Sequence, residues 1–211
     1  MSDHSIPKLY HRYFVEKQDE RRQLFEVVAD RYHPQKGIYP GSFVHITPSL
    51  FISEMTYIDS DRRLSAFFED SKVREFIAEN KVYPQDPVID WYQSDYSEKL
   101  PVQKGIFDVM FSFYAGFISQ ICKGYLKEGG IIVCNNSHGD SSLASVDKDY
   151  QLVAVIRRNT DNFTISKENL DTYLIKKDGT PINREKVIKR MVGENFTKKA
   201  FAYIFRYQPK S

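Results

Sequence analysis

Gly41 and Asp59 combine residue types and a spacing that suit a binding site. Gly41 lies in a turn that contains Gly and Pro, and Asp59 follows 18 positions later, directly after the apolar run Met55–Ile58. A glycine allows close approach of the backbone to a ligand, because it has no side chain to collide with it. A carboxylate about 20 residues after such a turn can accept hydrogens from two ribose hydroxyl groups. The stretch Gly37–Asp61 therefore predicts a nucleotide site.

The same interpretation assigns ligand contacts to four neighbours, Gly37, Tyr39, Ser42 and Asp61. Asp59 also has a simpler interpretation, as a solvated residue or as the N-cap of the helix that follows. Asp61 is a second candidate for that cap. The sequence leaves these alternatives open.

The polar loop Asn135–Ser141 holds the acid and base candidates. It follows an apolar run, Ile131–Cys134, and in open α/β sheets ligands bind beyond the carboxyl ends of the strands. His138 is predicted to remove a proton from a reacting group, with Asp140 orienting its ring. The alternative is a loop that only caps the next helix.

Alternating apolar runs and amphipathic segments must position these residues. The pattern predicts strands that alternate with helices, which indicates a mostly parallel sheet covered on both faces. The predicted strands are Gly37–Gly41, Met55–Ile58, Val88–Gln93, Phe107–Tyr114, Ile131–Cys134, Tyr150–Arg157 and Phe201–Tyr207. The predicted helices are Leu9–Arg31, Arg62–Asn80, Phe117–Lys127, a short one ending at Val146, and Asn183–Val192.

Composition narrows the class of protein. The chain has 211 residues, 41% of them apolar and 27% charged, which is typical of one globular domain. We expect a helical cover over residues 1–36, a nucleotide-binding core over 37–157, and the rest of the sheet with a small insertion over 158–211. A formal charge of +2 gives no nucleic-acid or membrane signature.

Signals for export or membrane insertion are not seen in this sequence. The segment that begins MSDHSIPKLY has no basic-then-apolar pattern, and no apolar run approaches the roughly 18 residues that span a bilayer. Cys122 and Cys134 both lie in apolar segments and are expected to be reduced and buried. These features predict a cytoplasmic protein. His33, His45 and His138 have no metal-ligand spacing with Cys or acid, so no metal is predicted.

The order of these signals resembles that of the class I S-adenosylmethionine-dependent methyltransferases. The resemblance covers roughly 37–157, with Phe201–Tyr207 placed like the last, antiparallel strand of that family. The run Leu126-Lys127-Glu128-Gly129-Gly130 is similar to the widespread L-K-x-G-G run before the fifth strand of the family. Phe107-Asp108-Val109-Met110 looks like its fourth strand. The resemblance implies a three-layer α/β/α Rossmann-like fold of about seven strands.

The resemblance also implies roles for particular residues. S-adenosylmethionine would be the cofactor, with its methionine end near Gly37 and Gly41 and its ribose on Asp59. Asp95 is placed to meet the adenine amine, and the remaining positions that the resemblance puts beside cofactor or acceptor are Tyr96, Ser112 and Tyr114. Asp95 is equally suited to bond its own turn, and Tyr96 and Tyr114 to ordinary packing.

The first motif departs from the family. The usual D-x-G-x-G-x-G is replaced by Gly37-Ile38-Tyr39-Pro40-Gly41-Ser42, so a catalytically silent member of the fold that serves as a binding or partner protein is the alternative. Ser112-Phe113-Tyr114-Ala115 lacks the Asn/Asp-Pro-Pro-Tyr motif of amino-methylating members. A nicotinamide-dependent oxidoreductase is disfavoured, because G-x-G-x-x-G is absent. The predicted partner is a small-molecule methyl acceptor that the sequence does not identify.

Overall fold

The chain forms two compact units, Met1–Leu100 and Pro101–Ser211, in a computed structural model that describes residues 6–160 and 162–210. The boundary falls inside the segment 37–157 that the sequence predicts as one core. The predicted division into a cover, a core and an insertion stays a prediction. Each unit is described by itself below.

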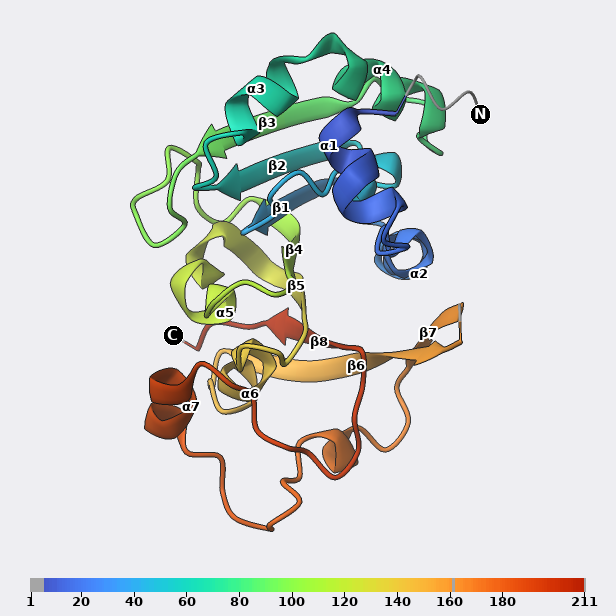
Figure 1. The fold of residues 1–211 in the computed structure, drawn as a ribbon. Helices are drawn as coiled ribbons and strands as arrows, with labels where there is room; N and C mark the ends of the chain where they lie inside the picture. Colours follow the sequence, from blue (N-terminus) through green and yellow to red (C-terminus); the bar gives the residue numbers. More distant parts are fainter. Residues whose placement is uncertain (1–5, 161, 211) are drawn as a thin grey trace. The chain divides into compact units, whose positions relative to one another are not determined.

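From residue 6 on, the first unit contains three parallel strands in the order β3-β2-β1 (Figure 1). Their bounds are Lys36–Pro40 for β1, Glu54–Asp59 for β2 and Val88–Gln93 for β3. The register places Pro40 beside Ile58 and Ile58 beside Tyr92. Because the strands are parallel, Gly41 and Asp59 follow neighbouring strands at the same edge, as the sequence predicts.

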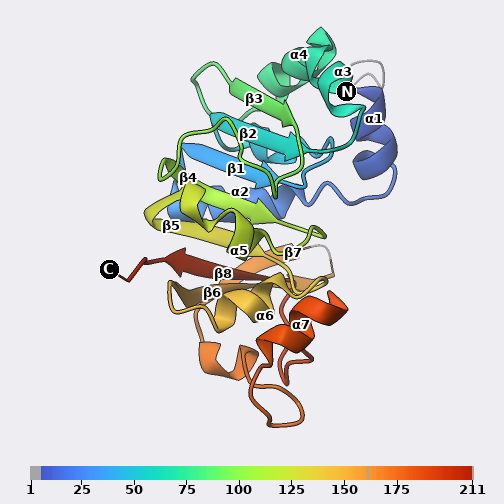
Figure 2. The ribbon, with the colours of Figure 1, turned by 90° about the vertical axis from the view of Figure 1, so that its left-hand side faces the viewer.

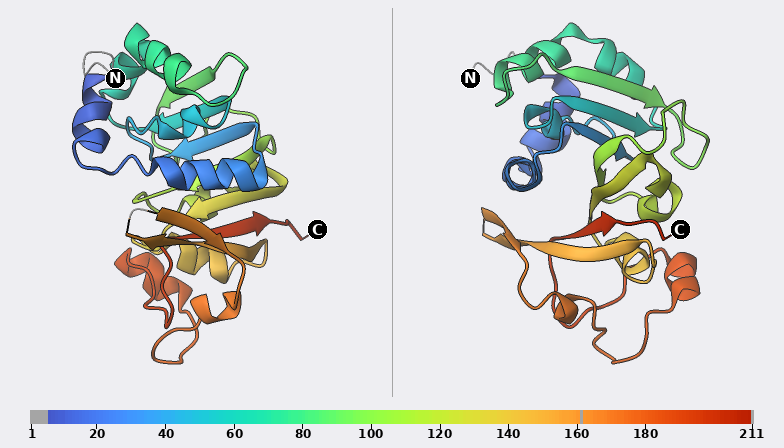
Figure 3. Two further views of the ribbon diagram at one scale, coloured as in Figure 1. Left: turned by 90° about the vertical axis from the view of Figure 1, so that its right-hand side faces the viewer. Right: turned by 180° about the vertical axis from the view of Figure 1, so that it is seen from behind.

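Helices of the first unit are short. They are α1 Lys8–Tyr10, a π-helical turn His11–Val15, α2 Arg22–Tyr32, a 3-10 turn Thr47–Leu50, α3 Leu64–Glu69 and α4 Ser71–Asn80. Opposite views place α2 on one face of β1, behind it in Figure 2 and in front of it in the left panel of Figure 3. The buried residues of α2 are Leu24, Phe25 and Val28, so its apolar stripe is the covered face.

The prediction of one helix over Leu9–Arg31 is wrong. Gln18 and Arg21 have positive φ, which ends any right-handed helix between them. The continuous helix over Arg62–Asn80 is also wrong, because Asp70 is extended and caps α4 by accepting the N–H of Lys72 at 3.0 Å.

The described residues of the second unit contain five strands in the order β4-β5-β8-β6-β7. Their bounds are Phe107–Ser112, Leu126–Cys134, Tyr150–Asn159, Asn162–Ser166 and Ala202–Tyr207 for β4 to β8. β4 and β5 are parallel, whereas β8 is antiparallel to both β5 and β6. The predicted antiparallel last strand is therefore confirmed. β7, which forms a hairpin with β6 in Figure 3, is missing from the predicted strands.

The Gly-Gly pair of the L-K-x-G-G run lies within β5, not at the end of a helix. Phe107 pairs with Leu126 but Val109 pairs with Ile131, so extra residues bulge from β5 between these pairs. Gly129 has φ +80°, which favours glycine, and a Cβ on Gly130 would lie 2.9 to 3.2 Å from three carbonyl oxygens. The bulge explains why two glycines stand here.

Helices of the second unit are also short. They are α5 Ile118–Ile121, a 3-10 turn Lys123–Tyr125, α6 Asp140–Ser145, a 3-10 turn Leu170–Tyr173 and α7 Arg184–Arg190. The predicted helix Phe117–Lys127 is wrong, because Gly124 and Tyr125 already accept backbone hydrogen bonds from Gly105 and Ile106. Within the described residues, no helix has the length and apolarity that crossing a membrane requires.

Candidate functional site

The turn after β1 is held against the end of β2. Gly41, at φ +69°, donates its N–H to Ile58 O at 2.7 Å, and Ser42 N donates to the same oxygen at 3.3 Å. Phe43 N donates to Asp59 Oδ2 at 2.8 Å. The predicted neighbours Gly41 and Asp59 therefore lie together, at the carboxyl ends of two adjacent parallel strands.

The Asp59 carboxylate accepts hydrogen bonds from the protein backbone and has lone pairs left for a ligand. Its Oδ1 accepts the N–H of Asp61 at 2.9 Å, in addition to the Phe43 bond on Oδ2. A carboxylate has about four lone-pair sites, so each oxygen can accept one more hydrogen. Asp59 is only half-buried, which leaves it accessible. The carboxylate can therefore fix the turn and also accept two hydroxyl groups.

Asp61 is committed to Arg63. The Arg63 guanidinium donates to both carboxylate oxygens, at 2.9 and 2.7 Å, and these bonds lower the pKa of Asp61 to about 2. The Arg63 guanidinium also lies 4.6 Å from the ring centroid of Phe43. Asp61 thus supports the turn from outside and is a poorer ribose ligand than Asp59.

Asp95 follows β3 and is exposed. It accepts the N–H of Ser97 at 2.8 Å, a bond that lowers the pKa of its carboxyl group. Ser94 N donates to Asp59 O at 3.1 Å, so the loop after β3 begins next to the end of β2. Asp95 therefore does bond its own turn, as in the simpler interpretation. Its exposed carboxylate still has lone pairs for another hydrogen bond. Tyr96 beside it is half-buried.

Gly37, Tyr39 and Ser42 are buried, and their predicted contacts with a ligand stay predictions. The hydroxyl of Tyr39 hydrogen-bonds His45 Nδ1 at 3.2 Å, and His45 Nε2 donates to Glu20 O at 3.0 Å. The His45 ring is stacked on Phe14 with centroids 4.2 Å apart. Burial, and next the Arg21 charge, lower the pKa of His45 well below its ordinary value, so the ring is neutral.

Ser112 and Asp140 form a buried network in the second unit. Ser112 Oγ donates to Asp140 Oδ2 at 2.5 Å, and Ser119 N donates to Asp140 Oδ1 at 2.9 Å. Asp140 is 2% exposed, and burial raises its pKa to about 6. The network joins β4, α5 and α6, so Ser112 and Asp140 connect these elements, and their predicted roles at a ligand stay predictions.

His138 does not pair with Asp140, whose oxygens are bound by Ser112 and Ser119. Instead, His138 Nδ1 lies 2.9 Å from Ser137 Oγ, and Ser137 Oγ donates to Asn135 Oδ1 at 2.9 Å. With Nδ1 protonated, His138 donates to Ser137 and its Nε2 is left as a free acceptor. The proton-accepting role of His138 stays a prediction.

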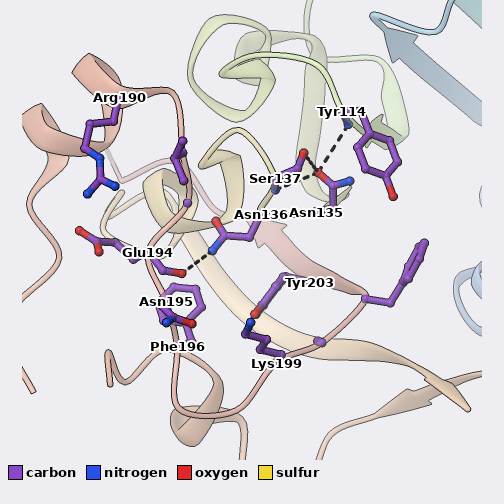
Figure 4. A pocket seen from close by; sticks show the side chains of 14 residues that line it. Tyr114, Asn135, Asn136, Ser137, Arg190, Glu194, Asn195, Phe196, Lys199 and Tyr203 are labelled. Atoms are coloured by element: carbon purple, nitrogen blue, oxygen red, sulfur yellow. Dashed lines mark hydrogen bonds between the residues drawn. The ribbon is translucent and has the colours of Figure 1, made fainter. Parts of the chain in front are cut away.

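A cavity of about 620 Å³ opens at the polar loop (Figure 4). Tyr114, Asn135 and Ser137 lie on one side of it, and Lys199 and Tyr203 on another. Tyr114 is 53% exposed and has φ +57°, a strained conformation for an aromatic residue. The cavity lies beyond the carboxyl ends of β4 and β5, where α/β proteins bind ligands.

The sequence pattern singled out Tyr114 and the loop, but not the opposite wall. Residues 190–203 contribute it, and no motif marks that segment. Arg190 and Lys199 are therefore lining residues that sequence reasoning missed, whereas Asn135 lies in the loop that the sequence singled out but was given no role there. Within the described residues, no group of three or more His, Cys, Asp or Glu side chains is arranged to hold a metal ion.

Comparisons with known proteins identify the fold. No protein-family model and no curated protein sequence matches the chain. A methyltransferase from Geobacter sulfurreducens is similar over 99% of this chain and 90% of its own length, with TM-score 0.52 and 11% identity. The YcgJ protein from Bacillus subtilis is similar over 92% of this chain and 100% of its own, with TM-score 0.51 and 12% identity.

A Klebsiella pneumoniae protein provisionally described as an O-methyltransferase is similar over 90% of this chain and 80% of its own, with TM-score 0.50 and 8% identity. Similarities at such low sequence identity show a shared fold, but they do not show which reaction a protein catalyses. The parallel strands with an acid after β2, the antiparallel β8 and these similarities agree. The chain has the fold of the class I S-adenosylmethionine-dependent methyltransferases.

Proposed function

We propose that the protein binds S-adenosylmethionine and transfers its methyl group to an acceptor. The observation that supports this most is Asp59. It ends β2 beside the glycine turn after β1 and has one unused lone pair on each oxygen, which suits two ribose hydroxyl groups. The nucleoside part of the cofactor therefore fits the residues present. Gly41 leaves room beside it, and Asp95 has an exposed carboxylate for an adenine amine.

The cofactor supplies an electrophilic methyl group on a sulfonium. The work of this chain would be to hold the acceptor and to keep its nucleophilic atom in line, which can supply much of the rate by itself. Asp59 and Asp95 would hold the nucleoside part of the cofactor. The cofactor would give up its methyl group and keep the electron pair of the broken carbon–sulfur bond, and the proton of the acceptor would leave to water.

Calorimetry with S-adenosylmethionine and S-adenosylhomocysteine tests the proposal. We expect binding that Asp59→Ala weakens at least tenfold. The matched control is Asp86→Ala, which removes an exposed carboxylate before β3 and should leave the affinity unchanged. If the wild-type protein and Asp59→Ala bind S-adenosylmethionine with equal affinity, Asp59 does not contact the ligand.

A catalytically silent member of the fold is the second candidate. It is favoured by the turn after β1, where the N–H groups of Gly41, Ser42 and Phe43 all donate within the protein. None of these three is left for the carboxylate of a methionine moiety. Absence of heat and of any thermal shift with either compound at millimolar concentration would support this candidate and contradict the first.

A further inference from the structure

A buried asparagine lines the cavity in the second unit. Asn135 is 7% exposed and lines the cavity. Its Oδ1 accepts the Ser137 hydroxyl at 2.9 Å, with longer contacts from Ser137 N and Tyr114 N. These donors fix the amide with its oxygen turned into the loop. Among the described residues its Nδ2 has no hydrogen-bond partner, so it can donate to a ligand.

The lining of the cavity holds more cations than carboxylates. Arg190 ends α7, and Lys199 precedes β8. In the part of the chain that the structure describes, neither side chain forms an ion pair or hydrogen bond. Glu194 also lines the cavity. Its Oε2 lies 3.5 Å from the buried Lys176 Nζ, which Asp178 also approaches at 3.4 Å, and its buried Oε1 has no hydrogen-bond partner among the described residues. With Arg190 and Lys199 against this single carboxylate, the lining keeps an excess of positive charge.

Four aromatic residues also line the cavity, together with polar and aliphatic ones. Tyr114, Phe196, Phe201 and Tyr203 line the cavity, and the rings of Phe196 and Tyr203 meet edge to face with centroids 5.9 Å apart. Burial raises the pKa of Tyr203 to about 12, so its hydroxyl is neutral and adds no negative charge. Aromatic walls favour a planar ligand, because flat faces stack at low entropic cost.

We propose that this cavity binds a planar aromatic anion, whose charged group meets Lys199 and Arg190 and one of whose oxygens accepts the Asn135 amide. The binding of this ligand does not depend on the proposed function. The volume, about 620 Å³, lies in the range of small-molecule sites.

Three probes of one shape and different charge test the ligand class: 2-naphthoate, its neutral amide and the cationic naphthylmethylamine. Calorimetry on the full chain at low salt, without S-adenosylmethionine, should give the naphthoate at least a tenfold tighter Kd than the amide. The amine should bind most weakly. The naphthoate affinity should fall as salt is added, because exposed charges are screened.

Variants locate the binding. Lys199→Met and Arg190→Met should each weaken naphthoate at least threefold, while Lys189→Met, a neighbouring cation of α7 outside the cavity, should have no effect. Asn135→Asp keeps the acceptor for Ser137 and replaces the donor by a charge. It should weaken naphthoate at least tenfold and leave the folded fraction, measured by circular dichroism, unchanged.

The inference is overturned if naphthoate shows no binding, if the amide or amine binds as tightly, or if Lys189→Met acts like Lys199→Met. Its failure is distinguishable from that of the proposed function. If the protein binds naphthoate but not S-adenosylmethionine, the inference about the cavity is supported and the proposed methyl transfer is contradicted. If the protein binds S-adenosylmethionine but the three probes bind equally well, the proposed function is supported and the inference about the cavity is contradicted.

Discussion

The carboxylate of Asp59 accepts the backbone N–H of Phe43 at 2.8 Å, so the acid that ends β2 also holds the turn that follows β1. Phe43 needs this support, because its φ of +46° is unfavourable for an aromatic residue. One side chain therefore links the shape of the turn to the position where a ribose would lie. A loss of ligand binding in an Asp59 variant must be separated from a loss of the turn.

Asp59→Ala should lower the free energy of unfolding by about 1–3 kcal/mol, because two backbone N–H groups lose a charged acceptor. Urea denaturation measures this value. Asp61→Ala breaks a partly exposed ion pair with Arg63 and also loses the bond from the Arg63 N–H at 2.9 Å, and it should cost about 1 kcal/mol. If both variants unfold like the wild type, Asp59 does not hold the turn and its loss can affect only a ligand.

The buried carboxyl group of Asp140 should make the protein less stable as pH rises. Its folded pKa is raised to about 6 from the ordinary 3.8, so between these values the folded state holds a proton that the unfolded state releases. The contribution is complete below about pH 4 and disappears above pH 6, a loss of up to about 3 kcal/mol.

Asp140→Asn tests this dependence by equilibrium denaturation at several pH values. The amide keeps an acceptor for Ser119 N and can donate to Ser112 Oγ, without the cost of a buried charge. The variant should lack the decline between pH 4 and 6 and match or exceed the wild type at pH 7. The exposed Asp171→Asn is the control. A variant with the wild-type decline would assign it to another group.

The sequence predicted the strands better than the helices, for a physical reason. β3 has the predicted bounds Val88–Gln93, because Pro87 and the polar residues after Gln93 delimit a short run. The predicted helix Leu9–Arg31 has the right apolar spacing, but it is broken by tertiary contacts. Tyr10 OH donates to Glu20 Oε1 at 2.5 Å, and Glu20 O accepts His45 Nε2, so the chain leaves the helix near Gln18.

The candidate site also has a part that the sequence could predict and a part that it could not. Gly41 and Asp59 are brought together because parallel pairing follows from the strand pattern. Asp140 and Ser112 have polar side chains that the fold buries, and no local signal separates such a pair from an exposed acid and base. Lys199 and Asn135 line the same cavity although they are about 60 residues apart in the sequence. Lys199 is brought there by the segment that leads into β8. Hydrophobic periodicity describes local structure only, so it cannot predict this contact.

His45 should give the opposite pH dependence to Asp140. Its folded pKa lies well below the ordinary 6.5, so below pH 6.5 the unfolded chain takes up a proton that the folded ring cannot. The free energy of unfolding should fall by about 1.4 kcal/mol for each pH unit below about 6, until the folded pKa is reached. His45→Gln should remove this dependence, although it lowers stability by removing ring contacts.

The matched control is His33→Asn, at an exposed position with φ +48°, where Asn is tolerated. Denaturation curves between pH 5 and 7.5 compare the two variants. A retained acid dependence in His45→Gln, or its loss in His33→Asn, would contradict the assignment to the buried ring.

Gly193 should be required for the cavity wall. A Cβ at this position would lie 2.1 Å from Asn136 O and 2.4 Å from Asn136 Cγ, so Gly193→Ala must displace the segment from the loop. Asn136 holds that segment by donating Nδ2 to Glu194 O at 3.0 Å, and the displacement strains this bond.

We expect Gly193→Ala to cost about 1–3 kcal/mol of unfolding free energy, the range for overpacking, and to weaken 2-naphthoate at least tenfold. Gly124→Ala is the control, since the nearest atom to its added Cβ is Lys104 Cδ at 3.9 Å. Because Arg190 and Lys199 lie on either side of Gly193 in the chain, moving this segment shifts both cations relative to Asn135. Tight naphthoate binding by Gly193→Ala would show that the ligand does not contact this wall.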